Sequence, residues 1–323
     1  MCDSVDWMDR MTSQDRLNQL TEVLHLYYEQ NLNQKEISKI MNVSVSTVSR
    51  MLKEAQELGM VEIVIKYPYA TIPSLAKELK AKFDLKDAYV LPTTGATYYD
   101  LVQSLGQVAA VVLDNYLKAD STLGISLGLS VASTIRAYNS SERKGSRILR
   151  FQGAADFEIM EGTNLAQVLA EKVGGKAMVV PSPWMLPSVE VCEAIMNEPA
   201  VCRFLEMAED ADLGLVGMGS MDPSHSTILR NHLISLEELN ALRAAGAVGE
   251  IFGKHYDQDG NVLDAEFNRR TVSIRLEKLR EIETVIGVAA SIHKVDPLLG
   301  AMRGRLINVV VTDSDAARAL LAR

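Results

Sequence analysis

The segment ISKIMNVSVSTVSRML, residues 37–52, joins two helical patterns through a tight turn and decides the fold of the first part of the chain. Ser44 is a favourable N-cap for the second helix, which we expect to end at Gly59. One side of this helix is apolar and consists of Val48, Met51, Leu52 and Ala55. A helix with one apolar side packs on its neighbours and leaves the opposite side to solvent.

The opposite side of the same helix presents small hydroxyl groups with one guanidinium and one ammonium group. Such side chains can contact base edges and phosphates from the major groove of DNA. The shorter helix before it begins at Gln34 and Lys35, where a helix N-terminus can bind phosphate. We therefore predict a DNA-binding surface made of Gln34, Lys35, Ser44, Val45, Ser46, Thr47, Ser49, Arg50 and Lys53.

The neighbouring segments favour a winged helix-turn-helix. An amphipathic helical pattern occupies residues 16–30, and residues 60–66, MVEIVIK, alternate as a short strand does. A helical hairpin with a polar outer face is the alternative interpretation. The order of short helix, turn, longer helix and strand favours the DNA-binding motif.

The composition is that of a globular protein with more than one domain. The chain has 323 residues, of which 47% are hydrophobic and 23% charged, and a net charge of -9. The negative charge does not exclude a local DNA-binding face. No apolar run approaches the roughly 20 residues that span a bilayer, and the first residues do not form a signal peptide. We expect a cytoplasmic protein in which Cys2, Cys192 and Cys202 are reduced thiols.

The sequence pattern changes after residue 66. Residues 67–73 include two prolines and no periodicity, which is typical of a linker. Strands are expected at 88–92, 122–126, 147–152, 177–181, 212–219, 284–290 and 306–312, and helices at 97–118, 163–173, 188–210, 235–245 and 313–322. This alternation predicts an α/β fold with a doubly wound, Rossmann-like, mostly parallel sheet. The predicted organisation is a DNA-binding domain (1–66), a linker (67–73) and an effector-binding and oligomerisation domain (74–323).

A candidate phosphate site lies in TLGISLGLSVASTIRAY, residues 122–138, which reads as a buried strand, a glycine-rich turn and a helix. Its small residues alternate as Gly124, Ser126, Gly128 and Ser130. Glycines let backbone N–H groups approach an anion, and the helix N-terminus favours negative charge. The alternative is a tight turn that needs glycine for packing. The segment lacks G-x-G-x-x-G and the Walker lysine, so we predict no nucleotide cofactor.

Other residues at or just after the carboxyl ends of predicted strands extend this site, because open α/β sheets bind ligands there. They are Gln152, Gly153, Ala154, Gly217 and Gly219. Lys294 begins a helix after a strand, where its ammonium can meet a phosphate or simply be solvated. Asp257 can bind ligand hydroxyls, or it can belong to a hairpin turn at Asp259-Gly260.

No catalytic or metal-binding set is evident. The five histidines show neither HxxxH nor HxH spacing, so no metal is predicted. An enzyme such as a sugar-phosphate isomerase or deaminase would need a general base facing the site, and Asp257 is the one candidate. We therefore predict a binding protein and keep the enzyme as the alternative.

Several segments together resemble the SorC family of bacterial sugar-responsive transcription regulators. They are LYYEQNLNQKEISKIMNVSVSTVSRMLKEAQELGMVEIVI, LGISLGLSVAS, DLGLVGMGS, LRAAGAVGEIFGKHYDQDG and VAASIHKVDPLLGAMRGRLINVVVTDSDAARALL. The resemblance covers nearly the whole chain. It implies a winged helix-turn-helix and a second domain that is similar to sugar-phosphate isomerases and binds its sugar without turnover.

The resemblance also assigns roles within the second domain. It implies that the segment 124–130 holds the phosphate of a phosphorylated sugar or polyol, with Lys294 as its charged partner. It implies that Asp257 and the turn 152–154 face the sugar hydroxyls. The expected partners are a double-stranded DNA operator and further copies of the chain in a homodimer or homotetramer, and no membrane.

Overall fold

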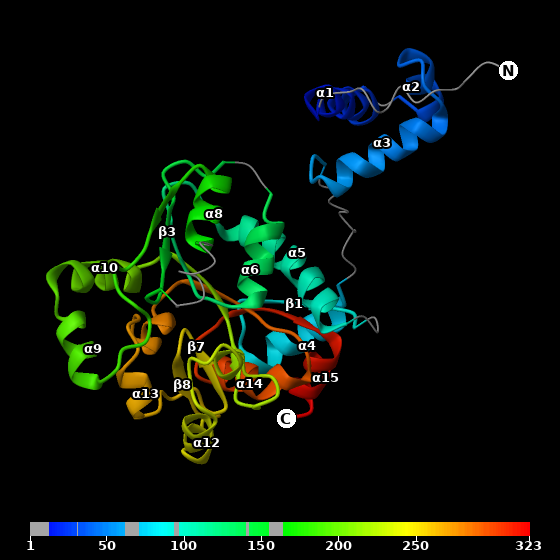
Figure 1. Ribbon diagram of the computed structural model, residues 1–323. Helices are drawn as coiled ribbons and strands as arrows, with labels where there is room; N and C mark the ends of the chain where they lie inside the picture. The colour runs from blue at the N-terminus through cyan, green and yellow to red at the C-terminus, as the bar shows by residue number, and fades with distance from the viewer. Residues whose placement is uncertain (1–12, 31, 62–70, 94–96, 140–141, 155–163) are drawn as a thin grey trace. The chain divides into compact units, whose positions relative to one another are not determined.

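The computed structural model describes residues 13–30, 32–61, 71–93, 97–139, 142–154 and 164–323 (Figure 1). The chain forms two compact units, Met1–Pro68 and Tyr69–Arg323. The strand predicted at 60–66 and the first residues of the predicted linker fall largely on residues 62–70, outside the described residues. At the end of that linker, Ile72 N–H donates a 2.7 Å hydrogen bond to Val90 O and Pro73 begins a helix. The second unit therefore includes these two residues.

The first unit is a small group of helices around one apolar core. Its elements are α1 (Ser13–Leu24), the π-helical turn η2 (His25–Glu29), α2 (Gln34–Ile40) and α3 (Val45–Glu57). The core consists of Leu20, Val23, Leu26, Ile37, Val48, Met51 and Ala55. The predicted apolar side of α3 is thus its buried side. An ion pair between Arg16 and Glu54 also joins α1 to α3.

Both helices of the turn begin at side-chain caps. Asn33 Oδ1 accepts hydrogen bonds from the N–H groups of Lys35 and Glu36, and the Glu36 carboxylate accepts one from Asn33 N–H. This reciprocal arrangement is a capping box. Ser44 Oγ accepts a 3.1 Å hydrogen bond from Thr47 N–H, which confirms the predicted N-cap of α3.

Among the described residues of the second unit, seven strands form one sheet in the order β1-β10-β9-β5-β2-β3-β4. They are β1 (Asp87–Leu91), β2 (Thr122–Ile125), β3 (Arg147–Arg150), β4 (Lys176–Met178), β5 (Leu213–Gly217), β9 (Thr284–Val288) and β10 (Val309–Asp313). Every neighbouring pair is parallel. The predicted doubly wound α/β fold is therefore confirmed.

Helices cover both faces of this sheet. The first face is covered by α5 (Tyr98–Tyr116), α6 (Leu129–Ala137) and α8 (Leu165–Val173), and the second by α4 (Pro73–Phe83), α10 (Pro199–Glu209), α14 (Val295–Arg303) and α15 (Ser314–Leu321). The helix predicted at 188–210 is divided into α9 (Val189–Met196) and α10. Pro199 causes this break, because proline has no N–H for a helix interior and is favoured in the first turn. No helix among the described residues is both long and apolar enough to cross a bilayer.

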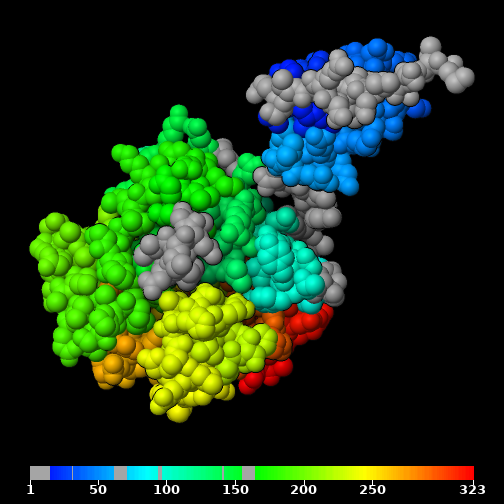
Figure 2. All heavy atoms as spheres, in the orientation of Figure 1, coloured from blue at the N-terminus to red at the C-terminus, as the bar shows by residue number. Residues whose placement is uncertain are grey.

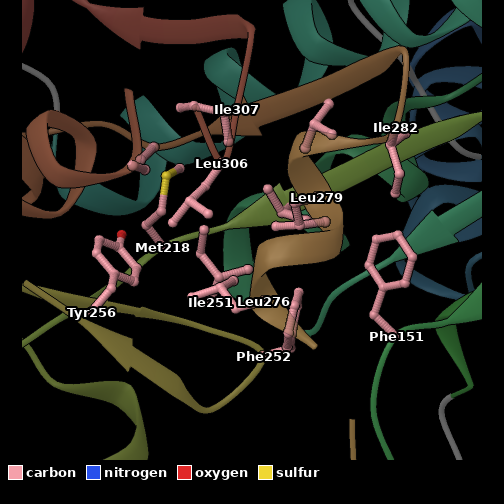
Figure 3. Packing of buried hydrophobic residues seen from close by; sticks show 14 of the residues in the cluster. Phe151, Met218, Ile251, Phe252, Tyr256, Leu276, Leu279, Ile282, Leu306 and Ile307 are labelled. Carbon is pink, nitrogen blue, oxygen red and sulfur yellow. The ribbon is translucent and has the colours of Figure 1, made fainter. Parts of the chain in front are cut away.

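A long insertion between β5 and β9 adds a smaller layer. It contains β6 (Gly219–Ser220), α11 (Thr227–Arg230), α12 (Leu236–Ala244), β7 (Gly249–Ile251), β8 (Lys254–Tyr256), α13 (Glu266–Arg269) and the 3-10 turn η3 (Leu276–Arg280). Strands β6, β7 and β8 form an antiparallel sheet. The yellow segment with α11 and α12 forms a bulge on the surface of the second unit (Figure 2). Beneath it, Ile251, Phe252 and Tyr256 share a buried cluster with Leu276 and Leu279 (Figure 3).

The strand order creates an opening at the carboxyl edge of the parallel sheet. β2 and β5 are neighbours, but the chain continues from β2 towards β3 and from β5 towards β9. The connections therefore leave these two strands in opposite directions. Ligands of open α/β sheets bind at such a switch point.

Candidate functional site

The candidate DNA-binding face is the solvent side of α3. Ser46, Ser49 and Arg50 are exposed, as is Lys53, and Val45 is 41% exposed. Four of the five basic residues between 13 and 61 lie on α2 and α3. The same two helices also carry Glu36, Glu54 and Glu57, so their four basic and three acidic residues give a net charge of +1 within an acidic chain.

Two of the predicted DNA-binding positions serve the helix start. Thr47 is only 8% exposed, and its hydroxyl lies 2.8 Å from Ser44 Oγ. Ser44 Oγ also caps α3 and lies 2.8 Å from Ser46 Oγ. At the start of α2, Gln34 is half-buried and Lys35 is exposed, but the capping box already uses the N–H group of Lys35. Phosphate contact there would depend on the side chains of Gln34 and Lys35.

The candidate effector site is a cavity at the carboxyl ends of the sheet strands, between the β2–β5 switch point and the inserted layer. It is lined by Tyr98, Leu127, Gly128, Leu129, Ser130, Gln152, Trp184, Gly217, Met218, Gly219, Thr227, Ile228, Asn231, Leu233, Glu250, Phe252 and Lys294. The structure thus brings together six of the predicted effector residues, which are Gly128, Ser130, Gln152, Gly217, Gly219 and Lys294.

The N-terminus of α6 opens on this cavity. Gly128 is the N-cap residue, with φ of 139°, and no side chain in the described part of the chain caps the helix. The first N–H groups of a helix have no partner within it, and together they carry partial positive charge. Gly128, Leu129 and Ser130 all line the cavity, so these N–H groups are placed to bind an anion.

Lys294 is the buried cation of the cavity. It ends the 3-10 turn η4 (Ile292–Lys294), and its Nζ donates a 2.8 Å hydrogen bond to Met218 O. Burial lowers the pKa of Lys294 to about 8, although neighbouring Glu250 acts in the opposite direction. The exposed Arg230 on α11 lowers it further. An anionic ligand would offset both the burial and this repulsion.

Glu250 is the acidic residue of the cavity. Its Oε2 accepts a 2.8 Å hydrogen bond from Gly253 N–H in the turn between β7 and β8. Burial raises the pKa of Glu250, which favours the protonated carboxyl. Gly219 lies directly opposite on β6, and a Cβ atom there would meet Glu250 Oε1 at 2.0 Å. Glycine at 219 is therefore needed for this placement of the carboxyl.

Gln152 offers an unused polar atom. The residue is 2% exposed and follows β3, and its Oε1 is buried without a hydrogen-bond donor among the described residues. An unsatisfied buried acceptor costs about 1–3 kcal/mol. A ligand hydroxyl in the cavity could supply the missing donor.

Five predicted effector residues do not line the cavity. Gly124 lies within β2, where a Cβ atom would be 1.9 Å from the Phe151 ring, and Ser126 Oγ accepts a hydrogen bond from Gly217 N–H. Gly153 and Ala154 hydrogen-bond through their N–H groups to Val272 O and Ser182 O. These roles agree with the packing alternative for the glycine-rich segment.

Asp257 belongs to a turn. Its carboxylate accepts hydrogen bonds from the N–H groups of Asp259 and Asn261, each at 2.9 Å. Gly260 has φ of 75°, a conformation that favours glycine. The segment 254–263 begins with β8 and continues into this turn, which is the alternative given for Asp257.

Several cavity residues were missed from the sequence. Trp184 lies in a segment without a regular element, where its Nε1 donates to Phe252 O at 3.0 Å. Glu250 and Phe252 come from the β7–β8 hairpin, which shows no clear alternation. The one available signal was Trp184 itself, since the chain has only two tryptophans.

Known proteins match both units. The family model of the sugar-binding domain (Sugar-bind) covers residues 67–322, and that of sigma-70 region 4 covers residues 15–57. The sorbitol operon regulator of Klebsiella pneumoniae is 30% identical over 319 residues, 96% of this chain and 100% of that protein. The deoxyribonucleoside regulator of Bacillus subtilis is 27% identical over 302 residues, 93% of this chain and 96% of that protein.

Solved structures give the same relationship. The crystal structure of full-length SorC from Klebsiella pneumoniae has a TM-score of 0.70 and 28% identity, and covers 96% of this chain and 100% of that one. A sugar-binding domain of a transcriptional repressor from Vibrio fischeri has a TM-score of 0.70 and 25% identity over 78% of this chain. These relatives are transcription regulators and not enzymes. The chain belongs to the SorC family of transcription regulators, which join a helix-turn-helix to a sugar-binding domain.

Proposed function

We propose that a phosphorylated sugar or polyol binds in the cavity and controls the affinity of this cytoplasmic regulator for its operator. The observation that carries the proposal is the pairing of an uncapped helix N-terminus with a buried lysine in one cavity. Both features favour an anion, and phosphate is the anion that a sugar metabolite most often carries.

The charges around the cavity support this ligand class. Lys294 and Arg230 are positive, while burial favours the neutral form of Glu250, the acidic residue among the described residues that line the cavity. The remaining polar groups suit a polyhydroxylated body. Gln152 Oε1 lacks a donor among the described residues, and burial favours the protonated form of Glu250, which can donate to a hydroxyl oxygen. An uncharged sugar would satisfy these groups but would leave Lys294 without a counter-ion.

On the DNA side, we propose that α3 enters the major groove. Arg50 and Lys53 would bind phosphates or a guanine, Ser46 and Ser49 would approach the bases, and Val45 would contact a thymine methyl group. Dimeric helix-turn-helix proteins place two DNA-binding domains on half-sites that are about 34–36 Å apart, or a multiple of that distance. We therefore expect a homodimer or homotetramer. Binding of the effector would change the spacing between two of its DNA-binding domains.

A thermal-shift panel tests the effector. The probes are sorbitol 6-phosphate, fructose 6-phosphate and deoxyribose 5-phosphate, each beside its unphosphorylated sugar and inorganic phosphate. We expect at least one sugar phosphate to raise the melting temperature when its parent sugar does not. The same compound should change binding to a DNA duplex selected by the wild-type protein. Stabilisation by unphosphorylated sugars alone would refute control by a phosphorylated effector.

A further inference from the structure

Two histidines and an aspartate meet beside the effector cavity. Asp222 and His225 lie between β6 and α11, and His293 lies in η4 after β9. His225 Nδ1 is 3.1 Å from Asp222 Oδ2, and His293 Nδ1 is 3.8 Å from the same oxygen. The two imidazole rings stack with centroids 3.4 Å apart and an interplanar angle of 16°. One oxygen therefore faces a nitrogen from each of two rings.

We propose that Asp222, His225 and His293 form a binding site for a divalent transition-metal ion, with Zn²⁺ as the representative ion. Two imidazoles and one carboxylate are a ligand set used for zinc, which commonly takes three protein ligands and one water. The proposal is independent of the effector and of DNA.

The spacing of the ligand atoms fits a metal ion. One potential ligand atom from each residue lies within 4.8 Å of the other two. Bonds of about 2.0–2.2 Å at a tetrahedral angle separate two zinc ligands by about 3.3 Å. The measured separations of 3.1 and 3.8 Å from Asp222 Oδ2 bracket that distance. Because the two rings are stacked and nearly parallel, at least one imidazole would have to rotate out of the stack for one ion to lie in the plane of both rings.

The surrounding hydrogen bonds orient the carboxylate. Ser224 N–H donates a 2.9 Å hydrogen bond to Asp222 Oδ1, and Asp222 N–H donates to Ser220 Oγ at 3.2 Å. Oδ1 is thereby occupied, and Oδ2 is the oxygen that points at the imidazoles. Outer partners of this kind fix metal ligands in their binding geometry.

The position of the site gives the ion a structural consequence. His293 directly precedes Lys294, and Asp222 follows β6, which contains the cavity residue Gly219. A bound ion would join these two segments next to the cavity. We expect the ion to raise the thermal stability of the second unit.

Metal titration of the full-length, untagged, chelator-treated protein tests the site. Calorimetry with ZnCl2 should give one saturable site per chain, and Co²⁺ should give visible absorption bands. Loss of a residue that only hydrogen-bonds to a metal ligand typically weakens metal binding about 10–100-fold. We therefore expect His225→Ala and His293→Ala to weaken it by at least about 100-fold, and Zn²⁺ to raise the melting temperature of the wild type only.

Two control variants distinguish this site from incidental binding. His25→Ala removes a matched histidine–carboxylate pair, in which Nδ1 is 2.8 Å from Glu29. Cys202→Ser removes a thiol beside Glu206. Both should bind Zn²⁺ as the wild type does. His225 and His293 side chains are 40% and 39% exposed, so their alanine variants should keep the metal-free melting temperature.

The proposal would be overturned by wild-type protein that binds no Zn²⁺ saturably. It would equally be overturned if the His225→Ala/His293→Ala double variant bound as tightly as wild type, or if binding were lost in Cys202→Ser instead. The remaining alternative, a hydrogen-bonded His–Asp–His cluster without an ion, gives the first of these results.

Discussion

Replacing Lys294 by methionine should separate ligand binding from stability. A hydrogen bond to a charged group contributes about 1.5–3 kcal/mol. Loss of the ammonium should therefore weaken binding of the stabilising sugar phosphate by about 10–150-fold. Calorimetric titration of the full-length protein with that sugar phosphate measures the change directly.

The stability of the ligand-free variant should change little. Lowering the pKa of Lys294 from 10.5 to about 8 corresponds to about 3 kcal/mol of cost for the charged form at neutral pH. Methionine removes this cost, but it also leaves Met218 O without its donor, which costs about 1–3 kcal/mol. These two effects oppose each other. We expect a free energy of unfolding within about 2 kcal/mol of wild type, a shift of a few degrees in melting temperature.

Lys254 supplies a matched control. Burial also lowers its pKa to about 8, and its Nζ donates to the carbonyl oxygens of Asn268 and Thr271, at 2.5 and 3.0 Å. Lys254 does not line the cavity. Lys254→Met should lower stability more than Lys294→Met, because it leaves two carbonyl oxygens and not one without their donor, and it should leave ligand affinity unchanged. Unchanged affinity in Lys294→Met, or equal losses of affinity in both variants, would refute the assignment of Lys294 as the phosphate partner.

Three further substitutions test the other groups. Arg50→Ala should weaken binding to the selected duplex by at least about 1 kcal/mol in fluorescence anisotropy, whereas Arg305→Ala, exposed in the second unit, should not. Burial lowers the pKa of His255 from 6.5 to about 4, so the folded state loses stability as the pH falls through this window. His255→Gln should remove about 3 kcal/mol of that acid sensitivity in urea denaturation, and an unchanged pH profile would contradict this. Because burial raises the pKa of Glu250 above 4.5, its ionisation destabilises the fold as the pH rises. Glu250→Gln should therefore become more stable relative to wild type as the pH rises above 4.5, and the opposite trend would exclude this cause.

The elements that depend on local sequence were the predictable ones. The apolar side of α3 and the Ser44 cap follow from spacing within one helix, and both are present. The inner strands of the parallel sheet, such as β2, β9 and β10, are short and buried on both faces, so they show as continuous apolar runs. The break at Pro199 was also readable, because proline in a helical pattern marks a boundary.

The cavity was predictable only in part, because its residues come from distant segments. Gly217 ends β5 and Lys294 lies in the turn after β9, positions at strand ends that the sequence reveals. Glu250 depends on an antiparallel hairpin inside an insertion and on the absence of a side chain at Gly219. Neither condition leaves a periodic pattern. The contact between His225 and His293 likewise has no signature in their spacing.

In the glycine-rich segment, Gly128 and Ser130 line the cavity, whereas Gly124 and Ser126 do not. The length of β2 explains this difference. A spacing of two residues suits a phosphate cradle, but it equally places residues on one side of a strand. Because β2 continues to Ile125, Gly124 stays in the sheet against Phe151. Ser126 N–H donates to Leu215 O and so continues the backbone pairing of β2 with β5. The Ser126 hydroxyl adds one further hydrogen bond, which it accepts from Gly217 N–H. That bond holds the two strand ends together where their connections diverge. In the proposed site, the anion would therefore contact the N–H groups at the start of α6 and Lys294.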